Sequence, residues 1–202
     1  MNHWPGPAQS WWQAVQAAWP DALRSARPQP PADDRVPAAV LVPFVLLDDG
    51  RPGIAFIQRP ETMPHHPGQI AFPGGKIDPD DADALAAALR ETNEEIGIPA
   101  ARIELLGEIE TFTTITSRFT ITPVIGRLLD TRPSYVPNPR EVDEVIEMPL
   151  AWLRDPAHRR VADAIYRGKP MRRVEYVWGE RIIWGATARI LDALLPRLPQ
   201  LP

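Results

Sequence analysis

Four charged residues near the middle of the chain have the types and spacing of a metal site. They are Arg90, Glu91, Glu94 and Glu95, in a segment predicted to be helical up to Gly97. At about 100° per residue, Glu91 and Glu95 lie side by side along one edge of the helix, with Glu94 next to them. Carboxylates so placed, near the negative end of the helix dipole, each cost about 0.2–0.5 kcal/mol. A divalent cation would reverse that cost, and hard oxygen ligands suit Mg²⁺ or Mn²⁺.

The helix that positions these side chains has recognisable ends. Asp80 or Asp81 is the predicted N-cap, and Asp83 adds negative charge where the helix dipole favours it. Gly97 is the predicted stop signal. Its buried stripe consists of Leu85, Ala88, Leu89, Thr92 and Ile96. A glycine-rich turn at 74–75 comes before the helix, so the whole segment points to metal-assisted chemistry on a diphosphate.

The run from Arg90 to Ile98 resembles the second half of the Nudix box, Gx5Ex7REUxEExGU, in which U is an aliphatic residue. Thr92 takes an aliphatic position, and Gly75 lies one residue farther from Arg90 than the box prescribes. This longer spacing resembles the coenzyme A pyrophosphatase branch of the Nudix family, whose box begins GGxxDxxD. The residues that match this variant are Gly74, Gly75, Asp78 and Asp81.

Segments on both sides of the box resemble the same branch. Arg59, Gly68 and residues 72–75 match its upstream signature, LLTxR[SA]x3Rx3Gx3FPGG, whereas Pro60 and Pro64 depart from it. Downstream, residues 138–142 and 148–150 resemble its NPxEV and PL segments, and residues 183–188 resemble its IWGxTA segment. Pro64 stands where the signature of this branch has its second arginine. Other nucleoside diphosphate derivatives therefore remain candidate substrates.

The resemblance implies an α+β chain with the Nudix fold, a mixed β-sheet between α-helices. It also implies that Arg90 orients the carboxylates. Glu91 and Glu95 are the first-choice metal ligands because they share a helix edge, and Glu94 is a third ligand or a contact through water. A backbone carbonyl near Gly74 or Gly75 is expected to complete the shell.

The sequence offers several candidates for the general base. Glu91, Glu141 and Glu144 are all candidates, since members of the family draw the base either from the box or from a later loop. His65 and His66 precede the box and could contact phosphate or act as a base. The expected substrate contacts are Arg59, as a bidentate phosphate donor, with Gly74 and Arg118.

The chain divides into an N-terminal segment and one domain. Residues 1–37 hold a tryptophan-bearing helix, capped by Ser10, and a proline-rich linker, and residues 38–202 form the Nudix domain. The tryptophans are expected to pack against the core. The predicted elements after the linker are strands at Ala39 to Leu47, Ile54 to Gln58, Ile103 to Thr113, Phe119 to Leu128 and Val142 to Met148, a hairpin of Val174 to Trp178 with Arg181 to Trp184, and a helix at Thr187 to Leu195.

Composition narrows the range of partners. The 202 residues include 44% hydrophobic ones, enough for one sizeable core. A net charge of −4 argues against nucleic acid, because a phosphate backbone requires a basic surface. No apolar run approaches the roughly 20 residues of a membrane span. The absence of cysteine excludes disulfides and thiolate nucleophiles and is compatible with a cytoplasmic location. A homodimer is compatible with the family, and no residue pattern here establishes one.

These observations predict a Mg²⁺- or Mn²⁺-dependent hydrolase that splits the diphosphate of coenzyme A or its thioesters. As the resemblance implies, its products are 3′,5′-ADP and the matching 4′-phosphopantetheine species. A second hypothesis is a Nudix hydrolase of ADP-ribose, NADH or a dinucleotide. A third is a non-catalytic module that binds a nucleotide, which the acids from Glu91 to Glu95 disfavour because a binder has no need of them.

Overall fold

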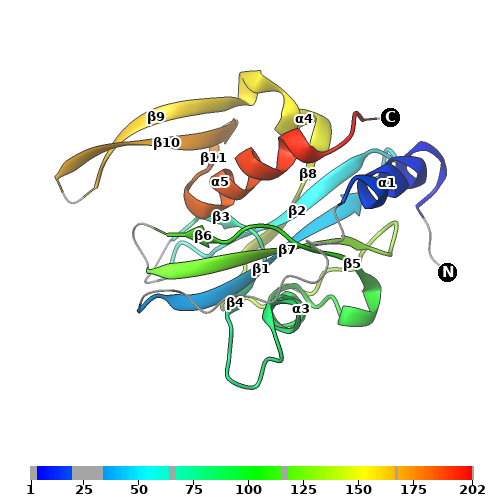
Figure 1. The fold of residues 1–202 in the computed structure, drawn as a ribbon, viewed down its shortest axis with the longest axis horizontal. Coiled ribbons are helices and arrows are strands. Elements are labelled where there is room, and N and C mark those ends of the chain that lie inside the picture. Colours follow the sequence, from blue (N-terminus) through cyan, green and yellow to red (C-terminus); the bar gives the residue numbers. More distant parts are fainter. Residues whose placement is uncertain (1–3, 20–33, 64–66, 115–117, 167, 202) are drawn as a thin grey trace.

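The computed structural model describes most of the chain, in the ranges 4–19, 34–63, 67–114, 118–166 and 168–201. A mixed β-sheet lies at its centre (Figure 1). The strands of this sheet are β1 (Val36–Leu46), β2 (Pro52–Gln58), β3 (Ile70–Ala71), β4 (Gly74–Lys76), β5 (Ile103–Glu108), β6 (Phe112–Thr113), β7 (Phe119–Leu128) and β8 (Glu144–Pro149). The main order is β3–β2–β1–β7–β5, with β8 on β2, β4 on β1 and β6 on β7. β1 and β7 run parallel to each other. β2 and β4 are antiparallel to β1, and β5 is antiparallel to β7.

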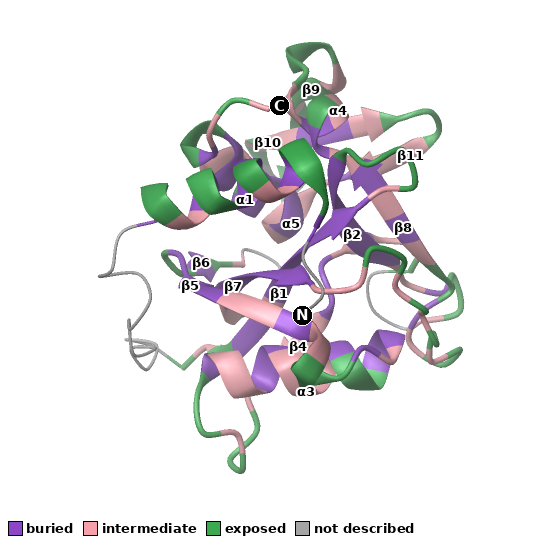
Figure 2. Ribbon diagram, turned by 90° about the vertical axis from the view of Figure 1, so that its right-hand side faces the viewer, coloured by how far each residue is buried: buried purple, intermediate pink, exposed green. Residues whose placement is uncertain are grey.

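Helices cover both faces of this sheet (Figure 2). They are α1 (Gly6–Ala18), α3 (Ala84–Ile96), α4 (Leu150–Arg154) and α5 (Gly185–Leu194). Successive residues of a strand point to opposite faces, so Leu41 and Val45 of β1 pack with α3, and Val42 and Phe44 pack with α1 and α5. The predicted α+β architecture, a mixed sheet between helices, is confirmed.

The N-terminal helix is part of the core on the α5 side of the sheet. Trp11, Trp12 and Trp19 are buried, which confirms the expected packing of these tryptophans against the core, and Trp4 is buried as well. Arg127 of β7 is also buried and lies over the rings of Trp4 and Trp12, 5.5 and 5.4 Å from their centroids. The helix begins at Gly6, several residues before the predicted cap at Ser10. The division of the chain at residue 37 stays a prediction.

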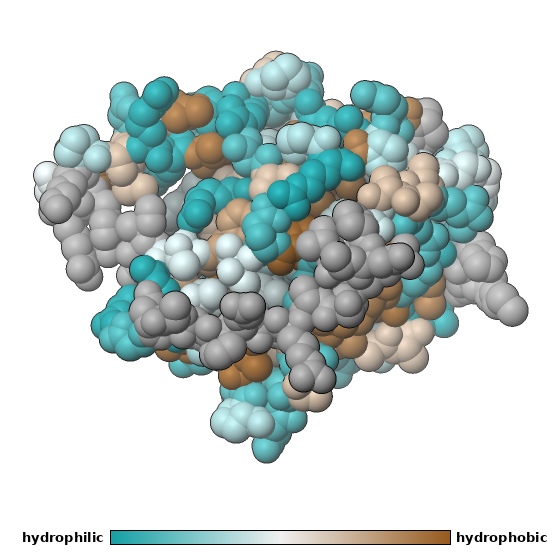
Figure 3. Space-filling model, viewed as in Figure 1, coloured by the Kyte–Doolittle hydropathy of each residue, from teal (hydrophilic) through white to brown (hydrophobic). Residues whose placement is uncertain are grey.

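A second, three-stranded sheet stands above the central one. It consists of β9 (Arg159–Tyr166), β10 (Lys169–Trp178) and β11 (Arg181–Ile183), in the order β11–β10–β9. The predicted hairpin corresponds to β10 and β11, and β9 is an additional strand. The β9–β10 hairpin extends away from the main body (Figure 1), and hydrophilic and apolar residues are interspersed on it (Figure 3).

Three other sequence predictions need correction. Asp83, not Asp80 or Asp81, caps α3, because its side chain accepts the N–H of Ala86 at 2.8 Å. The predicted strand from Ile103 to Thr113 is divided into β5 and β6. The last helix begins at Gly185, two residues before the predicted start. Within the described ranges, no helix is long and apolar enough to cross a membrane.

Candidate active site

Strand β4 lies directly beside the glutamates of α3. It pairs with β1, with Gly74 opposite Val40 and Gly75 opposite Ala39. The N–H of Gly74 donates a 2.8 Å hydrogen bond to Glu95 Oε2. A Cβ on Gly75 would lie only 2.4 Å from Glu91 Oε1, so this position has no room for a side chain. The two glycines, predicted as a turn, are therefore part of strand β4, where Gly74 binds one carboxylate and Gly75 leaves space for the next.

Three carboxylates converge at this point. Glu91 and Glu95 of α3 and Glu141, from the loop before β8, each offer an oxygen, and these oxygens lie within 4.8 Å of one another. Glu95 is buried, and the other two are half-buried. Of the predicted ligands, Glu91 and Glu95 are thus together, and Glu141, considered only as a base, joins them. Glu94 is not in this group.

Arg90 joins the loop before α3 to the carboxylates. Its Nε and Nη2 donate to the two oxygens of Asp81 at 3.0 and 2.9 Å. Its Nη1 donates to Glu91 Oε1 at 2.9 Å and to Glu94 Oε2 at 3.0 Å, and Nη2 also donates to the carbonyl of Lys76. Both oxygens of Asp81 face the guanidinium in this bidentate contact, and α3 itself begins three residues later, at Ala84. Arg90 holds Glu91 in one orientation, as the family resemblance implies.

Burial raises the pKa of Glu95 and of Glu91 and so favours their protonated forms. Desolvation raises the pKa of Glu95 to about 8, against the opposing effects of the Gly74 N–H and the positive charge of Arg59, and the neighbouring Glu91 and Glu141 raise it further. Desolvation also raises the pKa of Glu91, despite its hydrogen bond to Arg90. A divalent cation would favour the ionised forms of all three carboxylates. The residues therefore fit a Mg²⁺ or Mn²⁺ ion in both donor type and charge.

The two departures from the Nudix box have local explanations. Thr92 is fully buried, and its hydroxyl donates to the carbonyl of Ala88 at 2.6 Å, so a polar side chain is satisfied at an aliphatic position. The extra residue after Gly75 lies in the loop that Arg90 fastens. There the N–H of Asp78 donates to Asp81 Oδ2 at 2.8 Å, and the Asp81 N–H donates to the Asp78 carbonyl at 3.0 Å.

The remaining predicted site residues lie in different surroundings. Glu144 is half-exposed at the start of β8 and accepts a 2.7 Å hydrogen bond from Arg181 Nη2. Arg118 forms an ion pair with Asp34 in an exposed position and has a positive φ of 56°. Neither belongs to the carboxylate group. Arg59 is close enough to influence Glu95, and its buried Nε has no hydrogen-bond partner within the described ranges. His65, His66 and Pro64 lie outside the described residues.

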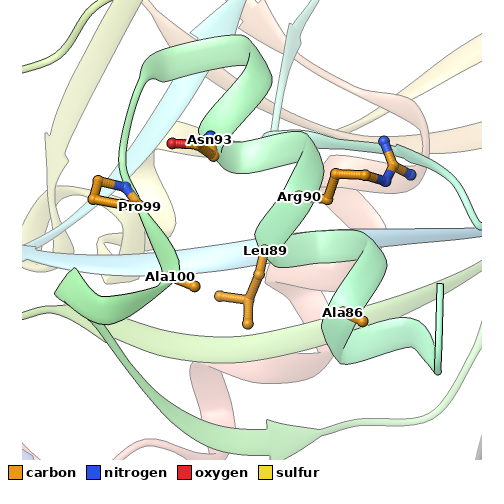
Figure 4. Close-up of a pocket in the computed structure, with 6 residues that line it drawn as sticks. All are labelled: Ala86, Leu89, Arg90, Asn93, Pro99 and Ala100. Atoms are coloured by element: carbon orange, nitrogen blue, oxygen red, sulfur yellow. The ribbon is translucent and has the colours of Figure 1, made fainter.

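A shallow hollow lies on the other side of α3 (Figure 4). Its lining residues are Ala86, Leu89, Arg90, Asn93, Pro99 and Ala100. At 100° per residue, Asn93 and Leu89 point away from Glu91 and Glu95. Arg90, which lines the hollow and also donates to Glu91, lies between the hollow and the carboxylate group.

Comparison with known proteins agrees with the sequence motifs. A family model described as NUDIX domain matches residues 35–167. A protein of Photorhabdus laumondii called "Uncharacterized Nudix hydrolase NudL" is 35% identical over 170 residues, covering 83% of this chain and 89% of that protein. Its namesake from Escherichia coli K12 is 40% identical over 158 residues, covering 78% and 80%. A MutT/nudix family protein from Enterococcus faecalis superposes with a TM-score of 0.52 at 15% identity, over 82% of this chain and 62% of that one, and shows the fold alone.

Proposed function

The chain belongs to the NUDIX family and is a Nudix hydrolase, and from this premise we propose that it cleaves the diphosphate of coenzyme A or its thioesters, using Mg²⁺ or Mn²⁺. The observation that carries the proposal is the convergence of Glu91, Glu95 and Glu141 beside the glycines of β4. The coenzyme A assignment is supported by the GGxxDxxD variant of the box, whose loop Arg90 fastens through Asp81.

Each residue of the site has a role in this proposal. Glu91, Glu95 and Glu141 would hold the cation, whose charge would neutralise the anionic oxygens of the diphosphate and lower the pKa of a bound water. Arg90 keeps Glu91 oriented, and the Gly74 N–H does the same for Glu95. Arg59, with its unpaired Nε, is the proposed phosphate donor.

The proposed base is Glu141 or Glu91, because both offer a half-buried carboxylate oxygen in the group that would hold the cation. Glu144 lies outside the carboxylate group, in an ion pair with Arg181. Glu94 is more than half exposed and is proposed as a contact through water. A general base must lie within hydrogen-bond reach of the proton that it abstracts, so geometry favours the two glutamates of the cluster.

The test is hydrolysis of coenzyme A, ADP-ribose, NADH and diadenosine polyphosphates with Mg²⁺ or Mn²⁺, with products identified by mass. We expect 3′,5′-ADP to be released from coenzyme A well ahead of the others. Preference for another substrate would reject the coenzyme A assignment and keep the Nudix chemistry.

Two variants test the site within the same assay. Glu141→Gln removes a ligand of the cluster and should reduce kcat/KM at least about 100-fold. Glu94→Gln is its matched control, since it changes an exposed acid on the same helix as Glu91 and should cost about 10-fold or less. Equal losses from the two substitutions would contradict the proposed ligand set.

A further inference from the structure

We propose that Asn138 is a positioning residue that holds Glu141 against the two glutamates of α3. The inference rests on the proposed function, because it takes Glu91, Glu95 and Glu141 as cation ligands. Two ligands come from one helix and share its rigidity. The third comes from a loop far along the chain, so its place depends on how that loop is held.

The backbone of the loop is attached to the end of α3. The N–H of Asn138 donates to the carbonyl of Glu95, and the N–H of Val136 donates to the carbonyl of Ile96, both at 2.9 Å. The last carbonyls of a helix have no partner within it, so the loop satisfies two of them. Asn138 is therefore bonded through its backbone to the residue that carries a buried ligand.

The side chain of Asn138 closes the loop on Glu141. Its Oδ1 accepts the N–H of Arg140 at 3.2 Å, and its Nδ2 donates to Glu141 Oε1 at 3.4 Å. Its carbonyl accepts the N–H groups of Glu141 and Val142 at 3.0 and 2.8 Å. Asparagine suits this turn because one amide group supplies both an acceptor and a donor. The donor engages one carboxylate oxygen of Glu141 and so limits the rotation of the carboxylate.

The start of the loop is held independently. Tyr135 donates a 2.6 Å hydrogen bond to Glu147 Oε1 of β8, and its ring packs against the cluster beneath α3. The backbone bonds to α3 do not require the Asn138 side chain. Loss of that side chain should therefore release Glu141 while the loop stays attached.

The test measures binding of Mn²⁺ alone to the full chain by calorimetry, together with kcat and KM. Asn138→Ala should weaken Mn²⁺ binding about 10-fold, the usual effect of removing a group that orients a ligand. In a Glu141→Gln background the same change should have less than a 2-fold effect, because the residue it positions has lost its charge. Asn138→Asp should weaken Mn²⁺ binding as well. Aspartate keeps the acceptor for the Arg140 N–H, but it replaces the donor to Glu141 by a negatively charged oxygen.

Asn93→Ala is the matched control, since it truncates an exposed asparagine that lines the hollow beside α3 (Figure 4) and should leave Mn²⁺ affinity unchanged. The positioning role is overturned if Asn138→Ala keeps the wild-type affinity, or if it costs the same factor with and without Glu141. Failure of the wild-type chain to bind Mn²⁺ would overturn both this inference and the proposed metal site. Tight binding and hydrolysis by both the wild type and Asn138→Ala would overturn the inference alone.

Discussion

Replacing Gly75 by alanine should damage the site while leaving the fold largely intact. The added Cβ would lie 2.4 Å from Glu91 Oε1 and 2.7 Å from Oε2, where ordinary contact begins at 3.4 Å. The carboxylate must therefore retreat by about 1 Å. Displacements of this size at a reacting centre cost roughly 100-fold in rate. The expected result is a fall of about that factor in kcat/KM, with weaker Mn²⁺ binding.

The effect on stability should be small, because the atoms that must move belong to a half-buried side chain. The displacement lengthens the 2.9 Å hydrogen bond from Arg90 Nη1 to Glu91, which is worth about 1 kcal/mol. The assay combines thermal unfolding with Mn²⁺ calorimetry and coenzyme A hydrolysis. A variant that kept wild-type kcat/KM and Mn²⁺ affinity would refute the role given to Glu91.

The neighbouring glycine provides the contrast. Gly74 has a φ of +149°, and a Cβ there would lie 2.3 Å from the carbonyl oxygen of Ala39, a backbone atom in the middle of the sheet. Gly74→Ala should therefore lower the unfolding temperature much more than Gly75→Ala. If both variants unfold at the same temperature, the distinction between a side-chain and a backbone obstruction is wrong.

Three further predictions concern the buried groups around the site and the core. Trp12→Ala should lower the free energy of unfolding by about 3–5 kcal/mol in a urea titration, because Trp12 is fully buried between Phe44, Trp4 and Arg127, and a loss below 1 kcal/mol would contradict its place in the core. Arg90→Lys should reduce kcat/KM by about 10–100-fold, because an ammonium lacks the bidentate contact to Asp81, and full activity would show that this contact is dispensable. Burial raises the pKa of Glu108 from 4.5 to about 7, so the folded chain binds this proton more tightly than the unfolded chain does. As the pH rises from 4.5 to 7, the contribution of Glu108 to the free energy of unfolding therefore falls by at most about 3 kcal/mol. Glu108→Gln should therefore raise the free energy of unfolding at pH 8 and make it less dependent on pH between 4.5 and 7. An unchanged pH dependence would exclude Glu108 as the source of that dependence.

The sequence was sufficient to predict the helix that carries Glu91 and Glu95. Helical periodicity is local, so the shared edge of these residues follows from their spacing, and Gly97 ends the helix in the left-handed conformation that its position requires. The mixed sheet between helices followed from the family resemblance. The propensities of Arg159–Tyr166, with two alanines and an aspartate, did not indicate β9, which exists because it pairs with β10.

Choices between equivalent residues depended on the tertiary structure. The sequence favoured Asp80 or Asp81 as the cap of α3, whereas Asp83 is the cap because the helix begins at Ala84, and Asp81 is instead bonded to Arg90. The roles proposed for Glu94, Glu144 and Arg118 stay predictions, although the ion pairs of Glu144 and Arg118 lie apart from the cluster.

The sequence by itself determined the acidic helix, because its periodicity depends on residues close together in the chain, whereas Gly74 and Gly75, predicted as a turn, lie in β4 because they pair with β1. Only the tertiary structure decided that Glu141 completes the carboxylate group. The loop that carries Glu141 is held on α3 by backbone N–H groups of Val136 and Asn138. Nearly every residue has such a group, so the sequence carries no signal of which ones will meet the open carbonyls of a distant helix.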